Sequence, residues 1–442
     1  MHMADALLAP AVAATMYAAS AVTAGASVKT LKKDEATAKL PTMAVTSALV
    51  FAGQMINYTI PGTGSSGHLC GGMLLSALLG PQAGFLSMVV ILTIQCLFFA
   101  DGGLLALGAN CWNMAFYGCF VGYYLLWRPI IKGKLFSSMS EKAAMRGKIV
   151  LASILGCVIT LQLGAFSVVL ETSISGIIDL PFGAFVGLMQ PIHLAIGLVE
   201  GLVTSAVLLF VYEARPELIM DVTASKSEGK YSLKTTLVVL AVAAAVVGGG
   251  LSLFASSNPD GLEWSLFGNA DAGYSQNMGL DEEDYGVQSG AADTAAAIQE
   301  KTAFLPDYAF SNSDSAAGTT VSGLVGSVMV AGLAALICMI GGFFRKKKAA
   351  NSVLQITPFR GCFSSPPIWH LRDDYEQISK GTVGAAGNGC PGGGKLPDPY
   401  AASCGETADN DFLHLHGRIL PQIRFIRVDS YGFISGHSLS NG

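Results

Sequence analysis

Along this chain, long apolar blocks alternate with short polar segments as far as Phe344. Most blocks approach the roughly 20 residues that an α-helix needs to cross a bilayer, so they predict transmembrane helices. The third block is too short for a full crossing and ends at the turn signal Gly80-Pro81. The pattern predicts an all-α polytopic membrane protein whose spans are Leu7–Val28, Thr42–Tyr58, Leu69–Leu79, Gln82–Ala100, Leu104–Trp127, Lys148–Leu170, Phe182–Val211, Leu233–Phe254 and Val321–Phe344.

The composition excludes an ordinary soluble protein. Of the 442 residues, 51% are hydrophobic and only 13% are charged, whereas soluble proteins carry about 25% charged residues. The 52 glycines suit the close helix packing found in lipid. A stripe of small residues in the second span, Ala44, Ala48 and Ala52, predicts either packing inside the bundle or docking of a partner membrane subunit.

The positions of lysine and arginine predict the orientation. Basic residues cluster at Lys29–Lys33, Arg128–Lys148, Lys226–Lys234 and Arg345–Lys348, whereas the segment 255–320 holds only Lys301 against eleven acidic residues. The positive-inside rule places these clusters in the cytoplasm, which leaves the N-terminus outside and the C-terminus inside. Met1, His2 and the loop that carries His68 then share the outer face of a prokaryotic cytoplasmic (inner) membrane.

The N-terminus offers three nitrogens for a metal ion. The amine of Met1, the backbone nitrogen of His2 and the His2 imidazole close two fused chelate rings in one plane. No cleavable signal-peptide pattern is visible, so we expect the terminus to be retained. The imidazole of His68 can complete a square, the geometry that Ni(II) and Cu(II) prefer. The alternative is an accidental Met-His start and a solvated loop histidine.

The surroundings of His68 are unusual for a solvated histidine. The run Gly62–Gly67 suits a tightly folded loop with unusual backbone angles, which could close over an ion. Cys70 is a possible further ligand, and it is the one cysteine of nine that lies close to this chemistry. The nine cysteines contain no Cys-x-x-Cys pair, so they predict neither a zinc site nor a disulfide framework.

Four further side chains have two interpretations each. His193 and Glu200 lie seven residues apart on one helical face within a span. They are either an internal hydrogen-bonded pair or functional groups. Asp5 is either an acceptor that supports a metal ligand or a helix N-terminal charge. Asn57 could cap or gate the loop.

Two motifs in the C-terminal part carry little weight. The run Gly389–Lys395 has the glycines of a phosphate-binding loop, but Leu396 replaces the Ser or Thr that should bind magnesium and Pro397 would break the following helix. The pair His414 and His416 is an isolated motif. Neither motif predicts a site.

Three motifs together resemble one family: Met1–Leu8 followed by Pro10, Asn57–Leu69, and His193–Gly201. They are similar to the substrate-capturing membrane subunit (S component, NikM/CbiM type) of energy-coupling-factor transporters for nickel and cobalt. The resemblance implies a seven-helix bundle over residues 1–220 and metal binding through Met1, His2 and His68. The Met-Ala-Asp-Ala-Leu start looks more like nickel members than cobalt members, so Ni(II) is the expected cargo and Co(II) the alternative.

The remaining chain divides in two. Residues 221–348, with Asn258–Trp264 and Leu305–Tyr308, look like the small two-helix partner subunit (NikN/CbiN type) of the same systems, here fused to the capture subunit. Its acidic external loop could hold metal weakly or be a solvated surface. Residues 349–442 resemble no known family; we expect a disordered cytoplasmic tail, or non-native sequence from a shifted reading frame.

The resemblance also implies partners, because this chain contains no credible ATPase. A transmembrane coupling subunit and two ATP-binding cassette ATPase subunits on separate chains would supply the energy. We expect a transport subunit and not an enzyme, since no carboxylate pair and no open coordination position accompany the proposed site. The other alternative is a channel or secondary transporter that works alone, although no inverted repeat is visible.

Overall fold

The structure, a computed structural model, describes residues 2–31, 33–176, 181–222, 229–273, 286, 289–310 and 317–354. The side chains of residues 33–38 and 337–354 lie outside this description. Met1, Lys226, the run Gly389–Lys395 and the pair His414 and His416 also lie outside it, as does the expected tail from residue 355 onward.

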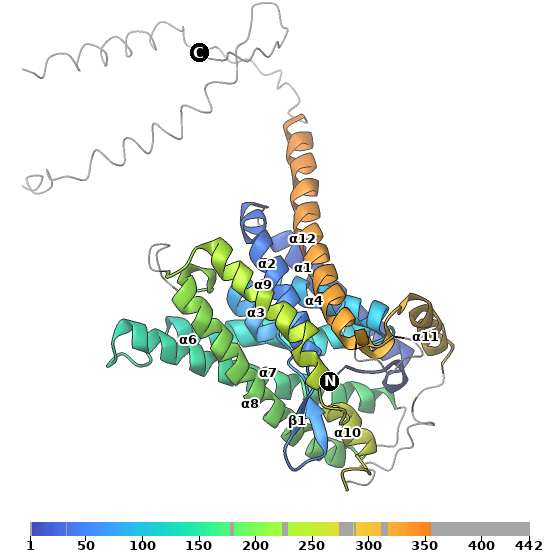
Figure 1. Cartoon of the computed structure of the whole chain (residues 1–442). Helices are drawn as coiled ribbons and strands as arrows, with labels where there is room; N and C mark the ends of the chain where they lie inside the picture. Colours follow the sequence, from blue (N-terminus) through green and yellow to red (C-terminus); the bar gives the residue numbers. More distant parts are fainter. Residues whose placement is uncertain are drawn as a thin grey trace, which may run out of the picture. The chain divides into compact units, whose positions relative to one another are not determined.

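The N-terminal half is built from helices and one small hairpin (Figure 1). A short 3-10 turn, η1 (Asp5–Leu7), precedes α1 (Pro10–Thr30) and α2 (Lys33–Gln54). The strands β1 (Tyr58–Ile60) and β2 (Ser65–Gly67) then lead into a second group of helices. This group comprises α3 (Gly72–Leu79), α4 (Pro81–Phe99), α5 (Leu107–Asn110), the π-helix Cys111–Trp127, α6 (Arg128–Lys132), α7 (Glu141–Ser175) and α8 (Phe182–Ala214).

The C-terminal half of the described chain has longer connections. After η3 (Pro216–Leu218) come α9 (Leu233–Gly249) and η5 (Leu251–Phe254). The elements that follow are α10 (Gly261–Phe267), α11 (Gly290–Thr302), η6 (Pro306–Tyr308) and α12 (Ala317–Leu354).

Among the described residues, six segments are long and apolar enough to cross a membrane: α1, α4, α7, α8, Leu233–Phe254 and Ala317–Leu336. This confirms the prediction of a helical protein with several membrane spans. The third expected span is α3, which has only eight residues, so it is indeed too short for a full crossing. The fifth expected span is the continuous run of α5, the π-helix and α6.

The glycine-rich loop is a β-hairpin, which the sequence analysis did not predict. Strands β1 and β2 pair antiparallel, with Tyr58 opposite Gly67 and Ile60 opposite Ser65. The unusual backbone angles expected of this run are confirmed, because Gly62 and Gly64 have φ values of 78° and 71°. Only glycine adopts such angles without strain, so these two residues allow the chain to reverse.

Close backbone approaches fix the helix packing. A Cβ at Gly72 of α3 would lie 3.1 Å from the carbonyl oxygen of Met114. A Cβ at Gly323 of α12 would overlap the carbonyl oxygen of Gly248 in α9. The second span contributes as well, since the Cβ of Ala52 lies 3.3 Å from the place that a Cβ at Gly248 would take. This contact favours packing inside the bundle for at least that member of the small-residue stripe.

Basic residues from different segments meet around two carboxylates. Glu213 lies at the end of α8. Its Oε2 is 2.9 Å from Nζ of Lys142 and 3.1 Å from Nζ of Lys230, and its Oε1 pairs with the Arg146 guanidinium. Asp221 lies 2.6 Å from Lys132. Lys142 and Arg146 of one expected cytoplasmic cluster therefore lie beside Lys230 of another.

The crossing of α9 and α12 yields a stability test. Replacing Gly323 by alanine should lower the melting temperature of the purified protein in detergent by several degrees, because the two helices must separate to admit the methyl group. Differential scanning fluorimetry measures this directly. Gly332→Ala, at a position in the same helix with open space around it, is the control and should not lower the melting temperature. Equal effects of both substitutions would contradict the packing.

Candidate metal centre

The N-terminal arm runs into the bundle, where hydrogen bonds to the main-chain atoms of Met3 hold it. Met3 is fully buried. The Asn110 side chain accepts a hydrogen bond from the Met3 N–H (2.8 Å) and donates one to the Met3 carbonyl (3.2 Å). The Gly103 N–H also donates to that carbonyl (2.9 Å). Three hydrogen bonds on one residue therefore fix where the preceding residue, His2, can lie.

Asp5 strengthens this attachment. Its Oδ1 accepts a hydrogen bond from the backbone N–H of Ala106 at 3.0 Å. A Cβ at Gly103 would overlap the Asp5 carboxylate, so only glycine allows the two segments to approach this closely. Asp5 also opens η1 and lines the same cavity as His2. Its hydrogen bond gives it an anchoring role that neither earlier interpretation stated.

The segment that carries His68 is fastened from two helices. Gln54 of α2 donates a hydrogen bond to the Cys70 carbonyl at 2.7 Å. The Glu200 carboxylate of α8 accepts hydrogen bonds from the backbone N–H groups of Cys70 (2.8 Å) and Gly71 (2.9 Å). These hydrogen bonds hold the chain immediately after His68 in one position.

The structure bears on two interpretations of the sequence: the pairing of His193 with Glu200 and the possible role of Cys70 as a ligand. His193 and Glu200 do not form an internal pair; His193 instead donates from Nδ1 to the Met189 carbonyl at 2.8 Å. Helical spacing placed both residues on one face correctly, but it could not identify their partners. The Cys70 thiol donates to the carbonyl of Met114 at 3.1 Å, and Cys70 is not among the residues that line the cavity around His2 and His68.

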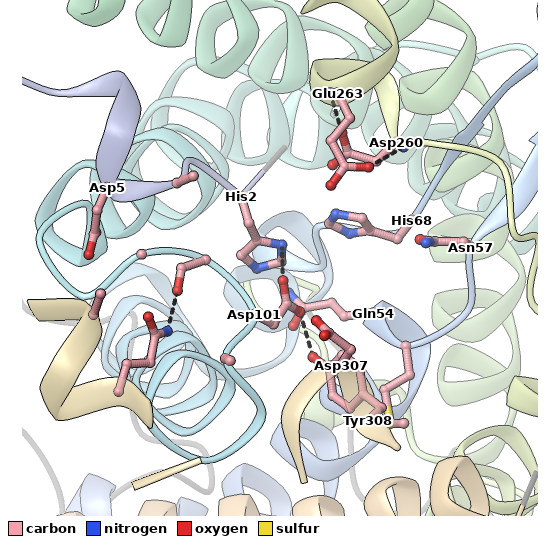
Figure 2. Close-up of a pocket in the computed structure, with 17 residues that line it drawn as sticks. His2, Asp5, Gln54, Asn57, His68, Asp101, Asp260, Glu263, Asp307 and Tyr308 are labelled. Carbon is pink, nitrogen blue, oxygen red and sulfur yellow. Dashed lines mark hydrogen bonds and ion pairs between the residues drawn. The ribbon is translucent and has the colours of Figure 1, made fainter. Parts of the chain in front are cut away.

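The structure brings His2 and His68 together. Their rings stack with centroids 5.0 Å apart and an angle of 22° between the planes. His2 Nδ1 lies 3.1 Å from Asp101 Oδ1, and the hydroxyl of Tyr308 donates to Asp101 Oδ2 at 2.5 Å (Figure 2). The Nε2 atom of His2 is buried and has no partner in the described part of the chain.

A cavity of about 510 Å³ opens around these rings. Asn57 lies on its wall, as the prediction of a gating or capping position allows. Five carboxylates also line it, and none of the described lining residues is Lys or Arg; the acidic residues are Asp5, Asp101, Asp260, Glu263 and Asp307. Such a wall attracts cations.

Burial favours the neutral form of both imidazoles. It lowers the pKa of His2 below its usual value, although the nearby charge of Asp101 acts in the opposite direction. It lowers the pKa of His68 to about 3. The charge of Asp260 raises the pKa of Glu263 to about 7. At neutral pH both imidazoles can therefore offer lone pairs, because no proton has to leave them first.

Residues of the expected partner-like domain form part of this cavity. Asp260 caps α10 by accepting hydrogen bonds from the N–H groups of Leu262 (2.7 Å) and Glu263 (2.9 Å), and the Glu263 carboxylate accepts one from the Asp260 N–H (3.1 Å). This is a capping box. The preceding residue, Pro259, accepts a hydrogen bond from the Ser66 N–H of the hairpin at 2.8 Å. At least this part of the acidic segment packs on the hairpin and is not a solvated surface.

Sequence reasoning missed Asp101 and Tyr308 as members of the site. Asp101 lies in a short segment without basic residues, and Tyr308 lies in one of the motifs that resemble the partner subunit. Those signals placed both residues outside the membrane but said nothing about their contacts. Within the described residues, no three His, Cys, Asp or Glu side chains are arranged to enclose an ion.

Comparison with known proteins identifies the family. Residues 2–218 match the CbiM family, the cobalt uptake substrate-specific transmembrane region, and residues 234–341 match the PDGLE domain. The putative fused nickel transport protein NikMN of Archaeoglobus fulgidus is 34% identical over 336 residues, which cover 75% of this chain and 96% of that protein. This chain belongs to the CbiM family and carries a fused PDGLE domain.

Other relatives are named for one of the two metals, nickel or cobalt. The probable fused nickel transport protein LarMN of Lactiplantibacillus plantarum is 34% identical over 225 residues, covering 49% of this chain and 66% of that protein. The cobalt transport protein CbiM of Sorangium cellulosum is 31% identical over 179 residues, covering 40% of this chain and 76% of that protein. This CbiM-family chain is thus a nickel or cobalt transport component of the membrane and not an enzyme.

The clamp on Met3 yields a prediction for metal binding. Asn110→Ala should weaken Ni(II) binding roughly 10- to 100-fold, because an arm that loses two buried hydrogen bonds of about 1 kcal/mol each must be ordered again when the ion binds. Isothermal titration of the purified protein measures the affinity. Thr15→Ala, which removes an exposed hydroxyl bonded only within α1, is the control. Unchanged affinity in Asn110→Ala would show that the clamp does not support the site.

Proposed function

We propose that this chain captures Ni(II) at the external face of a prokaryotic cytoplasmic membrane and passes it inward. The observation that carries the proposal is the stacking of His2 on His68, 5.0 Å apart, inside a cavity lined by carboxylates. The Met1 amine, the His2 backbone nitrogen, the His2 imidazole and the His68 imidazole form the proposed ligand set. Nitrogen ligands in a square favour Ni(II), and Co(II) is the alternative cargo.

The His2 ring must turn when the ion binds. In the proposed chelate, Nδ1 closes the ring with the backbone nitrogen, but in the structure Nδ1 faces Asp101. Rotation about the Cβ–Cγ bond exchanges the two edges of the imidazole. Asp101 can then accept a hydrogen bond from Nε2, which orients the ring and strengthens it as a ligand. The hydroxyl of Tyr308 donates a hydrogen bond to Asp101. Tyr308 therefore connects the rotation of the His2 ring to the PDGLE domain.

The dimensions of α8 support the proposed orientation. His193, eleven residues from the start of α8, lines a small cavity together with His68, and Glu213 lies among the basic residues at the C-terminal end of the helix. Twenty residues separate them, which is roughly 30 Å of α-helix and close to the thickness of the hydrocarbon core. The metal site would then face outward and the basic clusters inward, with the C-terminus in the cytoplasm.

Inward transport requires energy from other chains in this proposal. A transmembrane coupling subunit and two ATP-binding cassette ATPases would distort the site and release the ion. The partner-like residues 221–348 act as a lid and an acidic mouth over the capture domain at residues 1–220. Uptake of Ni(II) by cells that express this chain without such partners would instead favour a channel or secondary transporter.

The free amine gives the sharpest test of the ligand set. Adding one alanine before Met1 should reduce Ni(II) affinity at least 100-fold, because the added residue destroys the fused chelate rings. His68→Ala should also abolish the yellow, diamagnetic Ni(II) complex, which absorption spectroscopy detects. Thr63→Ala in the same hairpin is the control. Normal binding by the extended protein would exclude the proposed ligand set.

The pH dependence of Ni(II) binding distinguishes ligation by the Met1 amine from ligation by the two imidazoles. The pKa of His68 is lowered to about 3, so this group stays neutral as the pH falls through the physiological range. The N-terminal amine, with a reference pKa of about 8, must lose its proton to bind. Affinity should therefore fall by about tenfold or more for each pH unit from 8 to 6. Titrations at several pH values measure this slope, and a flat profile would contradict ligation by the amine.

A further inference from the structure

One buried imidazole near the capture site has no assigned role. His193 in α8 is fully buried. Its Nδ1 lies 2.8 Å from the Met189 carbonyl, which can only accept, so Nδ1 carries the proton. In the neutral ring the lone pair is then on Nε2, and this atom has no hydrogen-bond partner among the described residues. An unsatisfied buried acceptor is costly and calls for an explanation.

The ring of His193 borders the capture site. It lines a small cavity together with His68, Cys70, Met114 and Asp260. The volume of this cavity is about 10 Å³, which is the lower limit for a single water molecule. His193, whose Nε2 is unsatisfied, therefore borders a space that bulk water does not fill and that His68, a proposed metal ligand, also lines.

The PDGLE domain closes this space. A Cβ at Gly261 would lie 3.1 Å from Cε1 of His193 and 3.0 Å from Cγ2 of Ile192. Glycine at this position lets the start of α10 rest directly on the imidazole. The neighbouring residue Asp260 lines both this small cavity and the larger one around His2. The same segment therefore covers the capture site and the pocket beside it.

We propose that His193 is the next ligand on the inward path: its Nε2 binds the ion as it leaves the capture site. This inference rests on the proposed function. A neutral imidazole binds Ni(II) and Co(II) well. In the exchange, the bond from His193 Nε2 to the metal forms as a bond to a capture nitrogen breaks, and the oxidation state of the metal does not change.

The surroundings of His193 suit a temporary ligand. No cage of three metal-binding side chains surrounds an ion position in the described residues, so His193 alone would hold the ion weakly. Weak binding is what a transit position requires, because an ion that is held tightly does not move on. Two helical turns further along α8, Glu200 fastens Cys70 and Gly71, so the segment after His68 must loosen before the ion can pass between these elements.

Two substitutions separate a metal ligand from a packing residue. His193→Phe keeps a planar ring but removes the lone pair, whereas His193→Cys keeps a metal-binding atom and loses the ring. Ser205→Ala in α8 is the matched control, since this hydroxyl bonds at 2.7 Å to the carbonyl of Gly201 in its own helix and only at 3.5 Å to that of Val150 in α7. Each purified variant is first titrated with Ni(II), and initial rates of radioactive Ni(II) uptake are then measured in cells that contain the complete transporter.

The proposal predicts that His193→Phe binds Ni(II) within about twofold of the unaltered protein but takes it up at least tenfold more slowly. His193→Cys should recover a clear part of the uptake rate, and Ser205→Ala should match the unaltered protein. Normal uptake by His193→Phe, loss of its capture affinity, or equal loss of uptake in the Phe and Cys variants would overturn the inference. Failure of the unaltered protein to bind Ni(II) would instead overturn the proposed function.

Discussion

The attachment of the N-terminal arm to the bundle is the constraint on which the rest of the site depends. A chain terminus is normally free, and ordering it costs conformational entropy. Here Asn110 and Gly103 bind the backbone of Met3, and the Ala106 N–H binds the Asp5 carboxylate. These contacts are made to main-chain atoms or to a short side chain, so they fix the direction of the chain and place His2 against His68.

The second element of the site is the fused PDGLE domain. Its sequence motif has a direct structural meaning: Asp260 caps α10, Gly261 rests on His193, Leu262 is buried, and Glu263 completes the capping box. Tyr308 reaches Asp101 from a second segment of the same domain. Because residues of both domains line one cavity, the fused domain forms part of the wall of the proposed capture site.

Much of this arrangement could be predicted from the sequence, and the rest could not, for identifiable reasons. The distribution of basic residues placed His2 and His68 on one side, and the structure brings their rings together. The short third span and the unusual glycine angles were also predicted correctly. Periodicity gives the face of a helix but not its partners, which is why the expected pairing of His193 with Glu200 was wrong.

The roles of Asp101 and Tyr308 depend on a contact between segments far apart in sequence. The hairpin pairs segments only a few residues apart, and its glycine-rich sequence indicated unusual backbone angles but not the strand pairing. The hydroxyl of Tyr308 lies 2.5 Å from a carboxylate that is 207 positions earlier in the chain. No local pattern encodes such a distance. The wrong pairing of His193 with Glu200 and the missed roles of Asp101 and Tyr308 concern contacts between segments, whereas the missed hairpin is a local feature.

The central claim is that the amino end of the chain and two histidines bind the ion with nitrogen atoms alone. X-ray absorption at the nickel K-edge of the purified, Ni(II)-loaded protein tests this claim most directly. The account predicts the edge feature of a square-planar ion and a first shell that contains only nitrogen or oxygen. A sulfur ligand, which would implicate Cys70, or a six-coordinate oxygen shell, which would place the ion among the carboxylates, would contradict it.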